Sequence, residues 1–194
     1  MKKQLLFLLA VGLLHPASAQ TRWNLDASHS NVKFTVTYSG VAEMDGQFNS
    51  FAGTILSNKE DFTDAQIEFT VDAASIDTDN EKRDEHLRSD DFFNAEKFPK
   101  MTFRSTSFRK TGDRTYVLEG DLTIRDVTKR VKFDVNYGGT VLDARGNTRA
   151  GFVARTTINR FDYNLKWNRV VESVSVVGAD VQVRINVTFI KATG

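Results

Sequence analysis

The chain has 194 residues, 40% of them hydrophobic, with 26 basic residues against 25 acidic ones and no cysteine. This length fits a single domain with a sizeable core, and the balanced charge argues against a nucleic-acid partner, which requires a basic face. Without cysteine there is no disulfide framework, so the core alone must stabilise the fold.

Residues 1–19 have the pattern of a secretory signal peptide. Met1-Lys2-Lys3 is a basic start, Leu5 to Leu14 is an apolar core, and Ala17-Ser18-Ala19 is a small-residue cleavage site. The apolar core is shorter than the about 20 residues that a membrane-spanning helix needs. We therefore expect cleavage after Ala19, export to the periplasm, and a single mature domain over residues 20–194.

Short segments in which apolar and polar residues alternate fill most of the remaining chain. A period of two is typical of half-buried antiparallel strands. The pattern predicts strands at 32–38, 46–56, 64–74, 100–108, 114–124, 130–140, 149–158 and 180–190. Short turns between consecutive strands favour a meander, and eight strands suffice to close a lipocalin-like barrel. We predict an all-β fold, an eight-stranded antiparallel barrel.

A helical segment is expected between the third and fourth strands, from about Ser75 to Pro99. Thr78-Asp79-Asn80-Glu81 has the spacing of a capping box, which starts a helix. Asp84 and Arg88 would then lie one turn apart and pair across the helix surface. Pro99 stops a helix and leads into the next strand. We expect this segment to cover one end of the barrel or part of its wall.

A second interruption runs from Arg160 to Gly178 and contains Phe161, Tyr163, Leu165 and Trp167. We expect a long loop or hairpin near a mouth of the barrel.

Two histidines, His29 and His86, lie outside the predicted signal peptide, and we expect no metal site. A catalytic zinc site needs three protein ligands and a structural one needs four, usually His or Cys. Asp26-Ala27-Ser28-His29-Ser30 holds the residue types of a catalytic triad. Neighbouring side chains of an extended segment point to opposite faces, so His29 cannot orient Ser28 or Ser30 for catalysis. We interpret this stretch as a polar start to the first strand.

The stretch Arg83-Asp84-Glu85-His86-Leu87 leaves two interpretations open. A run of charged residues is usually a solvated helix face with intrahelical pairs. Alternatively, Arg83 or His86 contacts the head group of a ligand at the end of the barrel.

Apolar side chains of one parity are expected to face the barrel interior, and the chain is rich in phenylalanine, with 15 in all. The residues predicted to contact a ligand there are Phe34, Val36, Phe48, Ile67, Phe69, Phe103, Leu118, Leu122, Phe133, Phe152, Ile158, Val183 and Ile185. An ordinary packed core and an open apolar cavity would give the same pattern, and eight-stranded barrels can have either.

Several motifs follow one another in a specific order along the mature chain. They are Trp23-Asn24-Leu25-Asp26, Gly46-Gln47-Phe48, Arg83-Asp84-Glu85-His86-Leu87, Asp91-Phe92-Phe93, Gly120-Asp121-Leu122-Thr123-Ile124-Arg125 and Ile158-Asn159-Arg160. In this order the chain resembles the YceI-like family of bacterial periplasmic proteins. Members of that family commonly have Gly where this chain has Asp126 and Asn164, and both residue types tolerate the left-handed conformation that Gly allows.

The resemblance implies an extended barrel that holds a long-chain isoprenoid, a quinone-like lipid or a fatty-acid-derived lipid in an internal tunnel. It also implies no enzymatic activity, and we expect no cofactor. We therefore predict a carrier or reservoir whose lipid head group lies near His29, Arg83 or His86. The alternatives are a hydrolase or isomerase that acts on a lipid with His29 or His86 as general base, and a structural, stress-related interaction protein. Transient contact with a membrane and a homodimer are left open.

Overall fold

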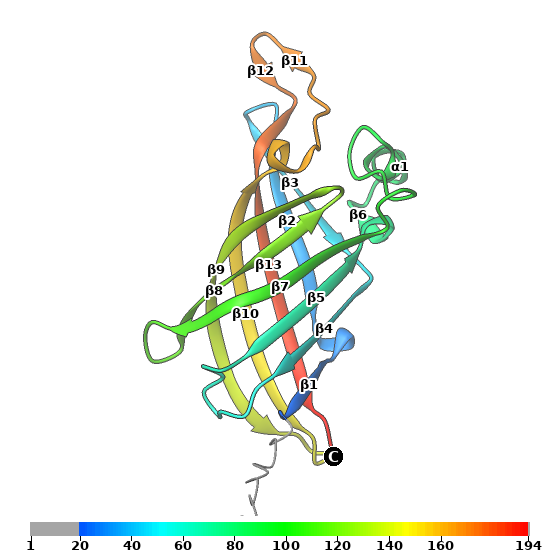
Figure 1. The fold of residues 1–194 in the computed structure, drawn as a ribbon. Helices are drawn as coiled ribbons and strands as arrows, with labels where there is room; N and C mark the ends of the chain where they lie inside the picture. Colours follow the sequence, from blue (N-terminus) through cyan, green and yellow to red (C-terminus); the bar gives the residue numbers. More distant parts are fainter. Residues whose placement is uncertain (1–19, 194) are drawn as a thin grey trace, which may run out of the picture.

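The computed structural model describes residues 20–193, and the predicted signal peptide lies outside them. The described chain is an antiparallel barrel with one short α-helix at one end (Figure 1). Its strands are β1 (Arg22–Leu25), β2 (Asn31–Tyr38), β3 (Ala42–Phe48), β4 (Phe51–Leu56), β5 (Gln66–Asp72), β6 (Ile76–Asp77), β7 (Lys100–Lys110), β8 (Thr115–Ile124), β9 (Val127–Leu142), β10 (Thr148–Asn159), β11 (Val170–Val171), β12 (Val174–Ser175) and β13 (Val177–Lys191).

Eight strands close the barrel in the order β1, β4, β5, β7, β8, β9, β10 and β13, because β1 pairs with both β4 and β13. The predicted eight-stranded antiparallel barrel is therefore confirmed, although the closing strand β1 was not predicted. Trp23 on β1 lies opposite Ile55 of β4 and Lys191 of β13, and its side chain is buried. With four residues, β1 is at the lower limit of the length over which alternation indicates a strand.

The prediction of one strand over 46–56 is wrong, because β3 ends at Phe48 and β4 begins at Phe51. The break is held by the chain before β6: Asn49 N–H donates to the carbonyl of Ser75 and Ser50 N–H donates to its hydroxyl, each at 3.0 Å. As a result β3 pairs with β2 and β6, whereas β4 pairs with β1 and β5. β2 also pairs with the first part of β13, so the sheet is extended at that end.

The predicted helix exists as α1 (Glu81–Arg88), but it begins after a different cap. Asn80 is the N-cap, and its side-chain oxygen accepts a hydrogen bond from Arg83 N–H at 3.0 Å. The capping box that was predicted to start at Thr78 is not formed. Within residues 20–193 no helix is long and apolar enough to span a membrane.

The predicted pair of Asp84 with Arg88 is also wrong. Asp84 is buried and accepts hydrogen bonds from the N–H and the hydroxyl of Thr78, at 3.0 and 2.5 Å. Arg88 instead pairs with Glu81 at 3.2 Å and donates to the carbonyl of Ala74 at 3.0 Å. Asp84 therefore holds the chain that precedes the helix, and Arg88 anchors the helix to the 3-10 turn (Ala73–Ser75) before β6.

The interruption after β10 combines a loop and a hairpin. A 3-10 turn (Arg160–Tyr163) ends at Asn164, whose φ of 60° confirms the expected left-handed conformation. The β11–β12 hairpin then projects beyond the barrel (Figure 1). In the turn between β8 and β9, the left-handed residue is Arg125, with φ of 55°, so the expectation for Asp126 is wrong.

Candidate functional site: an apolar cavity in the barrel

An apolar cavity runs through the interior of the barrel. Its volume is about 210 Å³, counted as space open to the centres of water molecules. One water needs about 10–15 Å³ by that measure, so this is far more than a packing defect. The inward residues of β13 from Val181 to Phe189 line it. Eight residue steps of a strand tilted by about 40° cover roughly 20 Å along the barrel axis.

All the predicted apolar contact residues except Phe48 line this cavity. They are Phe34, Val36, Ile67, Phe69, Phe103, Leu118, Leu122, Phe133, Phe152, Ile158, Val183 and Ile185. Phe48 is buried beside the cavity, between the rings of Phe34 at 5.6 Å and Phe93 at 5.7 Å. Further lining residues come from segments that the alternation did not mark, among them Phe92, Phe93 and Leu165.

Glycines in the barrel wall explain why so many phenylalanines leave the centre open. Three glycines each lie under a ring: Gly46 under Phe34, Gly53 under Phe69 and Gly120 under Phe103. A Cβ added at Gly46 would lie only 2.3 Å from the ring of Phe34, and one at Gly53 would lie 2.6 Å from that of Phe69. The rings can therefore lie against the wall where a larger residue would push them inward.

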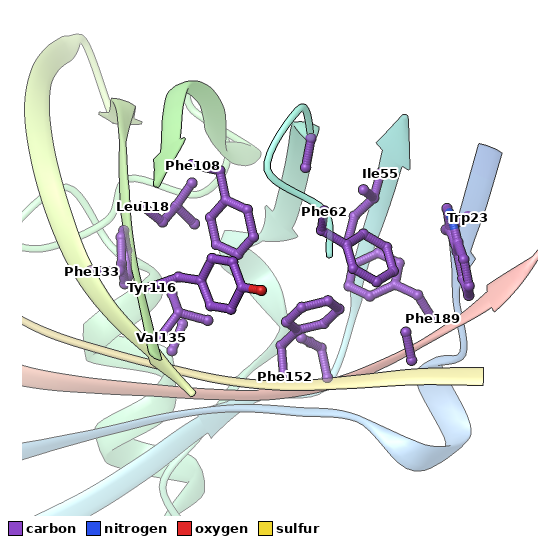
Figure 2. Close-up of a cluster of buried hydrophobic side chains, with 14 of the residues drawn as sticks. Trp23, Ile55, Phe62, Phe108, Tyr116, Leu118, Phe133, Val135, Phe152 and Phe189 are labelled. Carbon is purple, nitrogen blue, oxygen red and sulfur yellow. The ribbon is translucent and has the colours of Figure 1, made fainter. Parts of the chain in front are cut away.

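One end of the cavity is closed by a cluster of aromatic side chains, which we call the aromatic plug: Trp23, Phe62, Tyr116 and Tyr137. Phe62 lies in the loop between β4 and β5 and is only 1% exposed. Its ring centroid is 5.1 Å from that of Trp23 (Figure 2). The centroid of the Tyr137 ring lies 5.7 Å from that of Phe62. Tyr116 donates to the carbonyl of Asp61 in the same loop at 2.8 Å. The role of Phe62 could not be predicted from the sequence, because a single aromatic residue in a polar loop forms no repeating pattern.

The opposite end, which we call the mouth, is formed by α1, the β2–β3 turn and the loop after β10. Here lining residues such as Val36 and Val177 are only half-buried. The ring of His86 packs edge-on against Phe92 at 5.1 Å and Trp167 at 5.4 Å, and its Nε2 lies 2.8 Å from a carboxylate oxygen of Asp91. His86 is thus a packing residue at the rim, and it does not line the cavity.

Arg83 also lies at this end but is held away from the cavity. Its Nε donates to the hydroxyl of Thr78 at 2.7 Å, and an Nη2 hydrogen is donated to the carbonyl of the same residue at 2.5 Å. Its Nη1 lies 3.9 Å from the sulfur of Met44 on β3. Arg83 therefore links α1 to the β3 edge. Neither Arg83 nor His86 is among the residues that line the cavity.

His29 lies on the 3-10 turn between β1 and β2 and does not line the cavity. Its Nδ1 is 2.7 Å from a carboxylate oxygen of Asp26 and 3.0 Å from the hydroxyl of Ser28. In a catalytic triad the acid and the nucleophile contact different nitrogens of the ring. Here both contact the same nitrogen, so this cluster cannot pass a proton from serine to histidine as a triad does.

The same cluster is an electrostatic anchor of the barrel end. Arg149 on β10 pairs with Asp26 and, at 2.6 Å, with Asp143. Hydrogen bonds from Ser28 and Arg149 hold the pKa of Asp26 well below its usual range, and Arg149 likewise lowers the pKa of Asp143. Both carboxylates are therefore ionised at neutral pH, and the network ties the first strand to the β9–β10 turn.

Among the described residues, Arg160 is the only ionisable one that lines the cavity. The sequence placed it at the start of an interruption and assigned it no role. No group of three or more His, Cys, Asp or Glu residues in the described part of the chain could hold a metal ion.

Comparisons with known proteins agree with this architecture. Residues 23–189 match the YceI-like domain family. A UPF0312 protein of Pectobacterium atrosepticum is 37% identical over 169 residues, covering 85% of this chain and 88% of the relative. Protein YceI of Escherichia coli O157:H7 is 36% identical over 170 residues, covering 86% of this chain and 88% of the relative.

Solved structures share the barrel. BcnA of Burkholderia cenocepacia superimposes with a TM-score of 0.75 at 21% identity, covering 87% of this chain and 99% of that protein. A YCEI protein of Campylobacter jejuni gives 0.68 at 27% identity, covering 79% and 88%. A polyisoprenoid binding domain from Saccharophagus degradans gives 0.67 at 16% identity, covering 88% and 98%.

Proposed function

The chain belongs to the YceI-like family, and we propose that it is an exported carrier or reservoir that holds one long-chain isoprenoid or related lipid in its barrel. The observation that carries the proposal is the cavity itself, which has a volume of about 210 Å³ and is lined mainly by aliphatic and aromatic side chains. Such a space suits one extended hydrocarbon chain. Quinone-like and fatty-acid-derived lipids share this shape and are the other candidate ligands.

Burial of hydrocarbon supplies the binding free energy with few polar contacts. Each methylene group transferred from water into an apolar site contributes about 0.8 kcal/mol, so ten groups contribute about 8 kcal/mol before the entropic cost of association. The plug at the far end limits how deep the chain can enter. We infer that the tail of the lipid points to Phe62 and that its head lies at the mouth.

The positions of the histidines favour binding over turnover. A general base must lie within hydrogen-bonding reach of the bond that reacts. Within residues 20–193, neither His29 nor His86 lines the cavity, and no Ser, Asp or Glu side chain does. The hydrolase or isomerase alternative therefore has no support from the geometry. A purely structural barrel would not require a cavity of this length.

Two further observations support the assignment of ligand and location. The Saccharophagus degradans domain, whose fold this chain shares, is described as polyisoprenoid-binding. The pattern of residues 1–19 supports export to the periplasm.

Native mass spectrometry of the protein purified from the periplasm tests the proposal. We expect a co-purifying lipid in the unsubstituted protein, called the parent below. We expect little or none in Ala154→Phe, in which a ring fills the middle of the cavity. Repeated recovery of a ligand-free parent that also fails to bind farnesol in vitro would refute a carrier role.

A further inference from the structure

Exposed apolar side chains gather at the mouth end of the barrel, and we call them the apolar tip: Tyr38, Val41, Val170, Val171 and Val174. Val41 lies in the β2–β3 turn and is 87% exposed, and Val170 on β11 is 55% exposed. The β11–β12 hairpin projects beyond the barrel (Figure 1). Within residues 20–193 these side chains therefore lie uncovered.

The β2–β3 turn and the hairpin are held together as one surface. Ser39 N–H donates to the carbonyl of Val176 at 2.9 Å. A Cβ added at Gly40 would lie 3.2 Å from Cγ1 of Val174, so the turn packs against β12. Val171 lies directly opposite Val174 across the hairpin. The valines of the two segments are thus neighbours, although they are distant in the sequence.

This surface borders the opening of the cavity. Tyr38 at the end of β2 lies opposite Val177 at the start of β13, and Val177 lines the cavity. Val36 also lines it, and in a strand its side chain points to the same face as that of Tyr38. Whatever contacts the apolar tip therefore lies at the mouth.

The charges beside the apolar tip are balanced. Residues 38–43 and 166–176, which carry the tip, contain two basic residues, Lys166 and Arg169, and two acidic ones, Glu43 and Glu172. All four are exposed, and no ion pair in the described chain includes any of them. A polybasic segment would indicate an anionic membrane. Equal numbers of both signs instead complement head groups that carry a phosphate and an ammonium group.

We propose that the apolar tip docks the mouth of the barrel onto a bilayer of zwitterionic phospholipids. This inference rests on the proposed carrier function and specifies where the cargo is exchanged. A lipid tail that crossed water between bilayer and cavity would lose the stabilisation that its burial provides, and direct contact of the mouth with the bilayer avoids that step. The valines of the hairpin leave water on docking and supply the affinity.

Flotation with vesicles of phosphatidylethanolamine and phosphatidylcholine tests the inference. We expect the parent to bind these vesicles. Binding should change little between about 0.1 M and about 1 M salt, over which the screening length falls from about 10 Å to about 3 Å. Addition of phosphatidylglycerol should also have little effect, because the tip has no excess of positive charge.

A triple variant with Val170→Thr, Val171→Thr and Val174→Thr should bind the vesicles about tenfold or more weakly, since less apolar surface leaves water. Threonine is β-branched like valine and suits a strand, so the hairpin is kept. The matched control combines Val141→Thr with Leu142→Thr. These residues are 62% and 67% exposed at the end of β9, beside the β9–β10 turn at the plug end. The control should bind as the parent does.

Tryptophan fluorescence gives a second measurement that keeps the other valines. The emission of Val171→Trp, after subtraction of the parent signal from Trp23 and Trp167, should shift to shorter wavelength with vesicles. The emission of Leu142→Trp should not shift. The reverse pattern would place the contact at the plug end and overturn the inference.

The outcomes separate docking from lipid carriage. A parent that binds farnesol in calorimetry but no vesicles would overturn the docking alone, and a parent that binds neither would overturn both proposals. Equal vesicle binding by the parent and the triple variant would exclude the apolar tip as the contact. Binding that requires phosphatidylglycerol and disappears at high salt would also overturn the inference. A dimer of the parent that the triple variant does not form would assign the tip to a second copy of the chain instead.

Discussion

Replacing Ala154 with phenylalanine is expected to block the cavity without unfolding the barrel. Ala154 lies on β10, between Val135 of β9 and Ile185 of β13, and its side chain lines the middle of the cavity. A phenylalanine suits a strand, and here its ring would enter existing space. The substitution therefore removes the volume that a lipid tail needs.

The expected changes in stability and in lipid affinity follow from the burial of the phenylalanine ring and from the part of the lipid tail that the ring displaces. Burying a phenylalanine side chain contributes about 1.5–3 kcal/mol, and strain from insertion offsets part of this gain. The free energy of unfolding should therefore stay equal or rise by up to about 2 kcal/mol. If the ring displaces about four methylene groups at about 0.8 kcal/mol each, the Kd for a lipid rises roughly 200-fold.

Urea denaturation and calorimetric titration with farnesol measure the two effects. Ala150→Phe is the control, because Ala150 lies on the same face of β10 but is fully buried in the packed part of the core, 0% exposed. It should lose about 1–3 kcal/mol from overpacking. A folded Ala154→Phe protein that binds farnesol as tightly as the parent would show that the lipid does not occupy the cavity.

Four other substitutions test the remaining structural assignments. Phe62→Ala should lower the free energy of unfolding by about 3–5 kcal/mol, as measured in urea, yet keep its farnesol affinity, because the plug lies beyond the lining residues; a large loss of affinity would place the ligand deeper. Arg149→Met should be less stable than the parent at pH 7. The pKa of Asp26 is depressed in the folded state, so its contribution is present above the usual value of 3.8 and is lost as the pH falls further. The difference in urea midpoint should therefore shrink at pH 3, and an equal difference at both pH values would contradict the ion-pair assignment. His29→Ala and His86→Ala should leave unchanged the mass spectrum of farnesyl phosphate incubated with the protein. Turnover by the parent that disappears in either variant would support catalysis instead.

The hollow interior depends on pairs of residues that are distant in the sequence. Phe34 on β2 lies directly opposite Gly46 on β3, and Phe69 on β5 lies opposite Gly53 on β4. Each pair matches a large ring with a residue that has no side chain. The barrel can thus be rich in phenylalanine and still enclose space, whereas the same rings over larger neighbours would fill it.

The sequence alone determined the class of fold and most of the residues that face inward. Alternation is a local property, so the parity of Val183 and Ile185 on β13 could be predicted from their immediate neighbours. The order of motifs then indicated the family. Only the tertiary structure decided whether the inward rings meet, because that depends on distances across the barrel. It likewise showed that Phe62 closes one end and that Arg160 is buried at the other, since both come from loops whose path no periodicity specifies.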